Sequence, residues 1–200
     1  MKKVSLAVLF ACCTLALSAQ DPIRVTYQGA KPNIMDFSWA YLFDDIENEE
    51  ECDHEAFAGV RNALSQYRER LPQEEGTTLT VDLKNGYILY EWEDENNSKK
   101  TEMCYWNESD GKHKLFAYNT WYYVDGKPAL GQYDGLTFWR YNNATKKMSM
   151  CQAPGFEVEY QNTTYSLPRV GKDIIVTKWD DKGRKKQKTL KWNGRGFTSK

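Results

Sequence analysis

The stretch NGYILYEWEDENNSKKTEMCYWNESDGKHKLFAYNTWYYVDG, residues Asn85–Gly126, decides the fold. It holds the pairs Asn85-Gly86, Asp110-Gly111 and Asp125-Gly126, and Asp134-Gly135 follows shortly after it. Such pairs supply the positive φ that tight hairpin turns require, and β-branched and aromatic residues fill the intervals between them. The pattern therefore predicts consecutive antiparallel strands from Gly86 to Gln152.

The segment His113–Val124 is apolar on both of its faces. Leu115, Ala117, Trp121 and Tyr123 share one parity, whereas Phe116, Tyr118, Tyr122 and Val124 share the other. Successive side chains of a strand point to opposite faces. We therefore expect other parts of the chain to cover this strand on both sides.

The same pattern predicts eight strands, at residues 78–83, 87–93, 101–106, 113–124, 136–141, 148–152, 173–179 and 187–192. Three glycine-bounded units of about 20 to 26 residues resemble one another loosely, which keeps a partial propeller as an alternative. We expect an α+β fold: a large twisted antiparallel β-meander, open or curled into a partly closed barrel, with one or two N-terminal helices packed on one face.

The N-terminal part supplies a short strand and two helices. Residues 23–27 are predicted as the strand and residues 33–46 as the first helix, although its apolar residues are not cleanly periodic. In the second helix Asp53 is the expected cap and Pro72 the stop. Its apolar stripe has 3-4-3-4 spacing and consists of Phe57, Val60, Leu64, Tyr67 and Leu71. This stripe is expected to pack on the sheet.

Residues 1–19 have the layout of a secretory signal peptide, with Lys2 and Lys3, an apolar run and small residues before Gln20. The run is shorter than the about 20 apolar residues that span a bilayer. Lipoprotein processing at Cys12 is the weaker alternative. We expect an exported protein, periplasmic or extracellular, with one domain at residues 20–200: a strand and helical part (20–76) followed by the sheet (77–200).

Three cysteines remain after such cleavage: Cys52, Cys104 and Cys151. The strings KTEMC and KMSMC place Cys104 and Cys151 at matching positions of two hairpins, whose strands are not neighbours in a plain meander. A disulfide needs Cα atoms within about 7 Å, so two buried thiols are expected. Cys52 lies in an acidic loop. Closure of the sheet into a barrel would reverse the expectation that Cys104 and Cys151 are unpaired.

The net charge and the lack of known sequence motifs argue against several classes of function. The net charge of −1 becomes −1 − 2 = −3 without Lys2 and Lys3, which argues against a nucleic-acid partner. The sequence contains none of the common nucleophile, zinc-protease, P-loop or dinucleotide motifs, and no cofactor is expected. Lysines gather at hairpin tips, where they protect sheet edges; the tip KGRKKQK could also contact an anionic glycan or lipid headgroup.

Metal and acid–base sites have weak candidates. Cys52 and His54, with Glu50 and Asp53, include zinc ligand types, but they are too closely spaced for a tetrahedron. The tip of residues 93–97 offers oxygens for calcium but lacks an EF-hand pattern. Both histidines, His54 and His113, are expected at the surface. Glu91 and Glu93 lie on one strand face about 7 Å apart, a separation that an inverting glycosidase uses.

Aromatic residues are the unusual feature of the composition, at 14% of the chain. Most of them are expected in the core and in cross-strand pairs. The sharper hypothesis is a concave aromatic face that the helices leave open for a sugar or peptide. It rests on Tyr90, Trp92, Trp139 and Tyr141, which share strand parity and are the candidate ligand-binding residues.

The strings NGYILYEW, CYWNESDGKHKLFAYN, GQYDGLTFWRYNNATKKM and LPRVGKDIIVTKW resemble a group of uncharacterised exported proteins of gut anaerobic bacteria. The resemblance covers about Gly76–Phe197. It implies an envelope location, and it implies no activity and no residue role.

Two functions are therefore expected, from different classes. The first is a non-catalytic binding module of the cell envelope, whose partner is a glycan, a peptide or another envelope protein. The second is a small carboxylate-dependent hydrolase acting on a polysaccharide. The hydrolase requires at least two acids in one pocket, one of them with a raised pKa.

Overall fold

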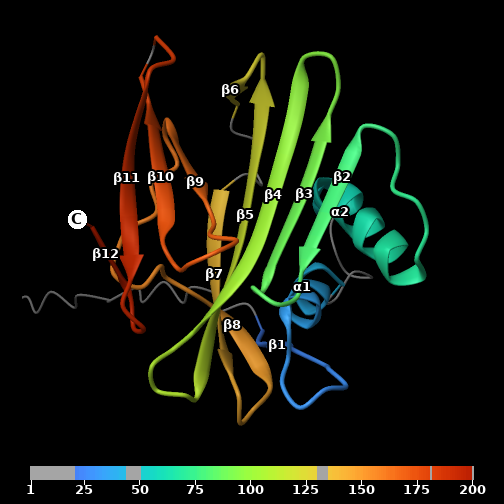
Figure 1. Cartoon of the computed structure of the whole chain (residues 1–200), viewed down its shortest axis with the longest axis vertical. Coiled ribbons are helices and arrows are strands. Elements are labelled where there is room, and N and C mark those ends of the chain that lie inside the picture. The colour runs from blue at the N-terminus through green and yellow to red at the C-terminus, as the bar shows by residue number, and fades with distance from the viewer. Residues whose placement is uncertain (1–20, 44–50, 130–134, 181, 200) are drawn as a thin grey trace, which may run out of the picture.

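Three layers make up the computed structural model, which describes residues 21–43, 51–129, 135–180 and 182–199 (Figure 1). A large antiparallel sheet forms the middle layer, with two helices against one face and a small sheet against the other. The α+β class and the antiparallel meander are thus confirmed, and the sheet is not a closed barrel. The segment expected to be a signal peptide lies outside the described residues.

The large sheet contains β1 (Ile23–Arg24), β2 (Thr77–Asp82), β3 (Tyr87–Glu93), β4 (Asn97–Asn107), β5 (His113–Val124), β6 (Lys127–Pro128), β7 (Gly135–Asn142) and β8 (Lys147–Cys151). Its order is β1-β8-β7-β5-β4-β3-β2, and β6 pairs with β5 beside this path. The turns predicted at Asn85-Gly86, Asp110-Gly111 and Asp125-Gly126 are found, each with its glycine at positive φ, whereas Asp134 lies outside the described residues. Asp125 and Gly126, for example, have φ values of 50° and 71° between β5 and β6, as a type I′ turn requires.

The small sheet contains β9 (Thr163–Ser166), β10 (Ile174–Trp179), β11 (Lys185–Trp192) and β12 (Phe197–Ser199), in the order β12-β11-β10-β9. One continuous sheet was therefore the wrong expectation. The edge beside β8 is already occupied, because Ile23 of β1 pairs with Met148. The later strands instead bury their apolar face against the large sheet, so that Phe197 and Trp192 pack on Trp106.

Both faces of β5 are covered, as its sequence predicts. Phe116 and Tyr118 belong to the core between the large sheet and the helices. Leu115, Ala117 and Trp121 belong to the core between the two sheets. The rings and aliphatic chains of β5 therefore hold all three layers together.

The helices are α1 (Ile34–Phe43) and α2 (Glu51–Glu69). Asn33 caps α1, since its Oδ1 accepts from the N–H of Met35 at 2.8 Å and its own N–H donates to Asp36 at 2.8 Å. The expectation that Asp53 caps α2 is wrong, because that helix begins two residues earlier. It ends before Arg70, which has a φ of 61°.

The apolar stripe of α2 is shorter than its spacing predicts. Val60 and Leu64 are buried and Phe57 packs against the same core, whereas Tyr67 and Leu71 are 43% and 52% exposed. The buried part of the stripe thus ends at Leu64, and Tyr67 in the last turn of the helix and Leu71 just after the helix are left exposed.

Cys104 and Cys151 are both free thiols. They lie in one row of the large sheet, since Cys104 pairs with Ala117, Ala117 with Phe138, and Phe138 with Cys151. Three strand spacings separate them by about 14 Å, far beyond the reach of a disulfide. Cys104 is buried and Cys151 is partly buried; the side chain of Cys52 lies outside the described part.

Candidate functional site

The four candidate aromatic residues share one face of the large sheet, but that face is not open. Tyr90, Trp139 and Tyr141 are 4%, 1% and 0% exposed and belong to the core beneath the helices, whereas Trp92 is partly buried at its margin. The expected concave aromatic surface is therefore corrected. The two helices cover it, and the small sheet covers the opposite face.

Two of these four residues still meet in a pocket. Tyr90 and Trp92 line a cavity of about 270 Å³ beside α2, together with Glu74, Glu75 and Lys99 among others. Lys99 crosses it and donates from Nζ to the backbone oxygen of Ala56 at 2.7 Å. The structure thus keeps Tyr90 and Trp92 together and separates them from Trp139 and Tyr141.

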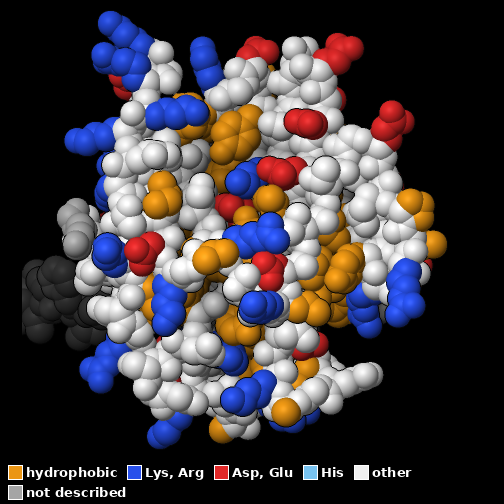
Figure 2. Space-filling view, viewed as in Figure 1, with side chains coloured by type: hydrophobic (Ala, Val, Ile, Leu, Met, Phe, Trp, Pro, Cys, Tyr) orange, Lys and Arg blue, Asp and Glu red, His pale blue; other side chains and the backbone are white. Residues whose placement is uncertain are grey.

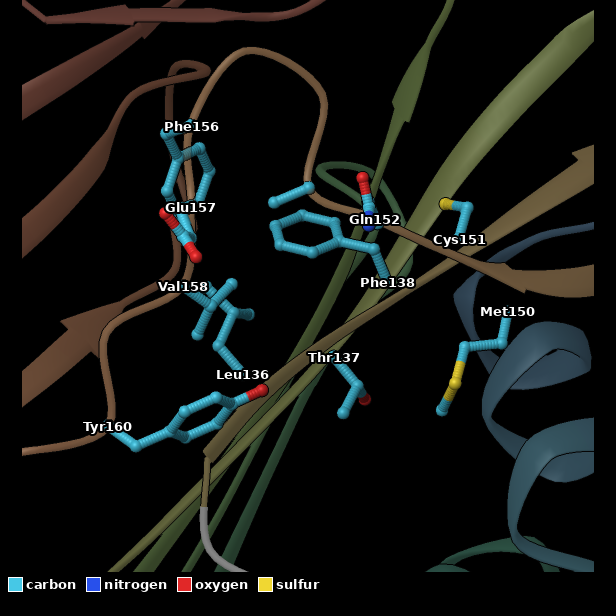
Figure 3. A pocket seen from close by; sticks show the side chains of 11 residues that line it. Leu136, Thr137, Phe138, Met150, Cys151, Gln152, Phe156, Glu157, Val158 and Tyr160 are labelled. Atoms are coloured by element: carbon cyan, nitrogen blue, oxygen red, sulfur yellow. The ribbon is translucent and has the colours of Figure 1, made fainter. Parts of the chain in front are cut away.

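A larger pocket of about 480 Å³ lies at the opposite side of the large sheet, where β7 continues beyond the end of β8 (Figure 3). We call it the edge pocket. Its lining comes from β7, from β8 and from the segment that leads to β9: Leu136, Thr137, Phe138, Met150, Cys151, Gln152, Ala153, Phe156, Glu157, Val158 and Tyr160. Its volume is in the range of about 300 to 1,000 Å³ that is usual for ligand pockets.

The edge pocket has an apolar half and a more open half. Leu136, Phe138, Phe156 and Val158 gather on one side in Figure 3, while Thr137 and Met150 lie on the other. The rings of Phe138 and Phe156 meet edge to face at 5.9 Å between centroids. Leu136 and Thr137 are neighbours in β7 and point to opposite faces of the sheet, so the pocket wraps around the sheet edge.

On its β8 side, β7 has no partner among the described strands beyond Phe138, although Gly135 and Leu136 are themselves buried. Pairing between β7 and β8 ends at Phe138 and Cys151, whereas β5 still pairs with Leu136 and Gly135. The N–H of Asn143 donates to the oxygen of Lys112, which fixes the alternation of bonded pairs along this ladder. By that alternation Thr137 bonds toward β5, and the N–H and C=O of Leu136 point away from β5 on the side of the pocket, where Leu136 is 1% exposed.

Two large exposed apolar side chains border the edge pocket. Met150 is 54% exposed and Tyr160 is 51% exposed. The Tyr160 ring packs against Gly135 so closely that a Cβ there would lie 2.8 Å from it. Cys151 lies deeper, and burial raises the pKa of its thiol to about 11 although Arg140 opposes this shift. The pocket therefore holds a neutral thiol at pH 7, which is a poor nucleophile.

A cluster of charged groups lies at the β4–β5 turn and was not predicted as a group. Ligand atoms of Glu108, Asp110 and His113 lie within 4.8 Å of one another. Arg140 binds this cluster, with its Nε 2.7 Å from Glu108 Oε1, and His113 Nδ1 lies 2.6 Å from Asp110 Oδ2. The hydrogen bonds from the side chain of His113 and from the N–H of Lys112 lower the pKa of Asp110 to about 2. The guanidinium occupies the place that a cation would need, so the cluster is an ion-pair network.

The other candidate metal and acid sites form no further cluster among the described side chains. The side chains of Cys52 and His54 lie outside the described part. In the tip at residues 93–97, Asp94 accepts from the N–H groups of Asn96 and Asn97, as in an Asx turn. Glu91 and Glu93 are exposed on β3. Among the described carboxyl groups a raised pKa is found at Asp36, where burial is the main cause, and Asp36 lies outside both pockets.

Sequence reasoning missed the edge pocket, because the segment from Gln152 to Tyr160 shows no strand or helix periodicity. One signal was present: the strand predicted at residues 136–141 is longer than its partner at residues 148–152, so the longer strand must lack a partner at one end. A helix able to cross a membrane is not found in the part of the chain that the structure describes. No protein-family model, curated protein or solved structure matches this chain.

Proposed function

We propose that the protein is a non-catalytic binding module of the cell envelope that takes an extended peptide segment in the edge pocket. The main support for this proposal is that the pocket reaches both faces of the sheet, at the stretch of β7 that continues past the end of β8. A peptide that adds as a strand places successive side chains on opposite faces. Export itself rests on the layout of residues 1–19.

The geometry supports a specific arrangement of the peptide. The N–H and C=O of Leu136 point away from β5 and offer the pair of backbone hydrogen bonds that strand addition uses. Leu136 is 1% exposed, so the side chains that cover it, Tyr160 among those that line the pocket, must move aside when the peptide binds. One peptide side chain then enters the apolar half between Leu136, Phe156 and Val158, and the next one lies beside Thr137 and Met150 on the other face. The apolar half favours an aliphatic or aromatic residue at the first position.

A hydrolase of polysaccharides is the alternative, and the edge pocket gives it less support. Glu157 is the carboxylate that lines this pocket. Acid–base hydrolysis of glycosides uses two carboxyl groups. The smaller pocket has Glu74 and Glu75 beside Trp92, so an assay on polysaccharides with Glu74→Gln and Glu75→Gln tests this alternative directly.

The test of peptide binding uses an array of hexapeptides with alternating apolar and polar residues, followed by fluorescence polarisation on the hits. Val158→Glu and Met150→Glu place charge in the two halves of the pocket, and each should weaken binding at least tenfold. Val170→Glu is the matched control, because Val170 is 79% exposed and lies outside the pocket lining. Equal binding by all three variants would contradict the proposal, as would an array without hits.

Backbone pairing has its own readout. In an amide NMR spectrum the Leu136 N–H should shift on peptide binding and become protected from hydrogen exchange. An unchanged Leu136 signal in the presence of a saturating peptide would show that the peptide binds without adding a strand.

A further inference from the structure

A second surface, separate from the edge pocket, has a strong local excess of positive charge. Residues 178–191 contain seven Lys or Arg and two Asp, a net charge of 7 − 2 = +5, while the whole chain has −1. The rest of the protein therefore has −1 − 5 = −6. This segment is the β10–β11 hairpin, and its basic tip lies at the upper left of Figure 2.

Like charges face each other within this hairpin. Lys178 of β10 pairs directly with Lys186 of β11, and Lys188 is one step further along the same face. Directly opposed like charges destabilise a sheet. Glu159 relieves part of this repulsion, because it forms an ion pair with Lys178 and lies 4.0 Å from Lys188. Such unrelieved repulsion between lysines is expected at a site that binds a negatively charged ligand, because the ligand then supplies the opposite charge.

A small pocket lies next to these lysines. It has a volume of about 160 Å³ and is lined by Lys127, Pro128, Asn162, Thr163, Trp179, Asp180 and Gly183. Lys127, from the β5–β6 hairpin, reaches the turn of the β10–β11 hairpin, since its Cε would lie 3.9 Å from a Cβ on Gly183. The pocket thus offers the amine of Lys127 and the amide of Asn162, and the carboxylate of Asp180 in its lining is held by Arg184.

Edge protection alone does not account for all of these lysines. β12 covers β11 at Leu190–Trp192, so the part of β11 nearer the turn is an exposed edge, and lysines there prevent strand pairing. Lys178, however, is on β10, which has a strand on each side. Lys127 belongs to the other sheet. Lysines from both sheets therefore lie close together, although only the exposed edge of β11 needs protection against strand pairing.

A membrane surface fits this face less well. The large exposed apolar residues of the described chain are Tyr67, Leu71, Leu83, Val124, Met150, Tyr160 and Val170, and none belongs to the β10–β11 hairpin. Peripheral binding to a bilayer normally adds inserted apolar side chains to the electrostatic attraction. A water-soluble polymer with regularly spaced negative charges needs the lysines alone.

We propose that the face of the β10–β11 hairpin that carries Lys178, Lys186 and Lys188, together with the adjoining pocket, binds an anionic polysaccharide with carboxylate or sulfate groups. The three lysines contact successive charges of the polymer, and one sugar residue enters the pocket beside Lys127. This site does not depend on the edge pocket, so either can fail without the other.

The test measures binding to heparin, which is sulfated, to polygalacturonate, which is carboxylated, and to neutral dextran, over a range of salt concentrations. Lys178→Gln/Lys186→Gln is the test variant. Lys84→Gln/Lys112→Gln is the control, because it removes the same charge from exposed turns elsewhere. The full chain should bind at least one anionic polymer and not dextran, with an affinity that falls as salt rises.

In the test variant the affinity should fall about tenfold, and the slope of log affinity against log salt should become shallower by about one per lysine removed. The control should keep both values.

Three outcomes would overturn the proposal. They are equal loss in test and control, binding to neither anionic polymer at low salt, and binding to vesicles of anionic lipid without binding to either polymer. Circular dichroism and thermal melting of each variant confirm that the comparison is between folded proteins.

Discussion

The carboxylate of Glu102, in the middle of β4, accepts a hydrogen bond of 3.1 Å from the backbone N–H of Leu167, just beyond β9. This bond joins the two sheets across their shared core. The same carboxylate accepts from the Tyr87 hydroxyl at 2.8 Å and from the Asn119 amide at 3.0 Å, although Glu102 is only 2% exposed. A buried charge is tolerated there because each oxygen has donors.

Removal of this carboxylate should destabilise the fold strongly. Glu102→Ala leaves three buried donors short of an acceptor, and we expect a loss of about 3 kcal/mol or more in the free energy of unfolding. Glu102→Gln keeps one acceptor oxygen and should lose less. Urea unfolding measures both, with Glu91→Ala as the exposed control, which should stay within about 0.5 kcal/mol of the parent. A loss for Glu102→Ala as small as that of the control would show that the network does not join the sheets.

The contact between Gly59 and Tyr90 sets the distance between α2 and the sheet. A Cβ on Gly59 would lie 2.6 Å from the Tyr90 hydroxyl oxygen. Alanine normally favours a helix over glycine by about 1 kcal/mol, but here Gly59→Ala should destabilise because the hydroxyl must move. In the Tyr90→Phe background the same change should be neutral or stabilising.

The four proteins of this double-mutant cycle are compared by urea unfolding. A coupling energy of at least about 1 kcal/mol is expected for two residues in contact. Additive effects of the two substitutions would mean that the helix shifts freely and that the close approach has no energetic weight.

Local chemistry made much of the meander predictable. The paired turn residues fixed the hairpins, so β3 and β5 have the bounds that the sequence predicts. The apolar character of both parities in β5 correctly indicated two covered faces. These signals are local, since a turn residue or a side-chain parity needs no knowledge of distant parts of the chain.

The predictions that failed concern features that depend on contacts between distant parts of the chain. The closure of the β8 edge by Ile23 and Arg24, two residues of β1, decides that the later strands form a second sheet, and no local pattern reveals it. For the same reason the rings of Trp139 and Tyr141 were expected at an open face, although α1 covers them. The short strands β9 and β12 lack periodicity because four and three residues are too few to show one.

The thiol of Cys151 should react slowly below pH 10. Its pKa is raised to about 11 by burial, from an ordinary value of 9.0. Only the thiolate reacts, so at pH 8 alkylation by iodoacetamide should be about 100-fold slower than for an exposed cysteine. Peptide mapping by mass spectrometry in a Cys52→Ser background separates Cys151 from Cys104, which is buried and should not react in the folded protein.

The same shift predicts the direction of a stability change with pH. The folded pKa lies above the unfolded one, so the stabilisation is fully present below pH 9 and is lost as the pH rises from about 9 through 11. Cys151→Ser should flatten this part of the curve of unfolding free energy against pH. An unchanged slope in that variant, or rapid alkylation of Cys151 at pH 8, would show that the thiol is not desolvated.

The approach of Gly155 to Phe197 holds the last strand against the core. A Cβ on Gly155 would lie 2.3 Å from the backbone oxygen of Phe197, and Gly155 has a φ of +89°. Gly171 provides a matched control, because its φ is +90° and nothing lies within 4 Å of its Cβ position. Gly171→Ala therefore introduces the backbone strain alone, about 1 to 2 kcal/mol, whereas Gly155→Ala adds a collision with backbone that cannot rotate away.

We expect Gly155→Ala to lose at least about 2 kcal/mol more than Gly171→Ala in urea unfolding. It should also weaken the near-ultraviolet circular dichroism, because the ring of Phe197 packs on Trp106 and Trp192 with centroids 5.2 and 4.8 Å apart. Equal stabilities of the two alanine variants would contradict this prediction. They would mean that β12 shifts to make room for the added methyl group and that the end of the small sheet does not fix the packing between the sheets.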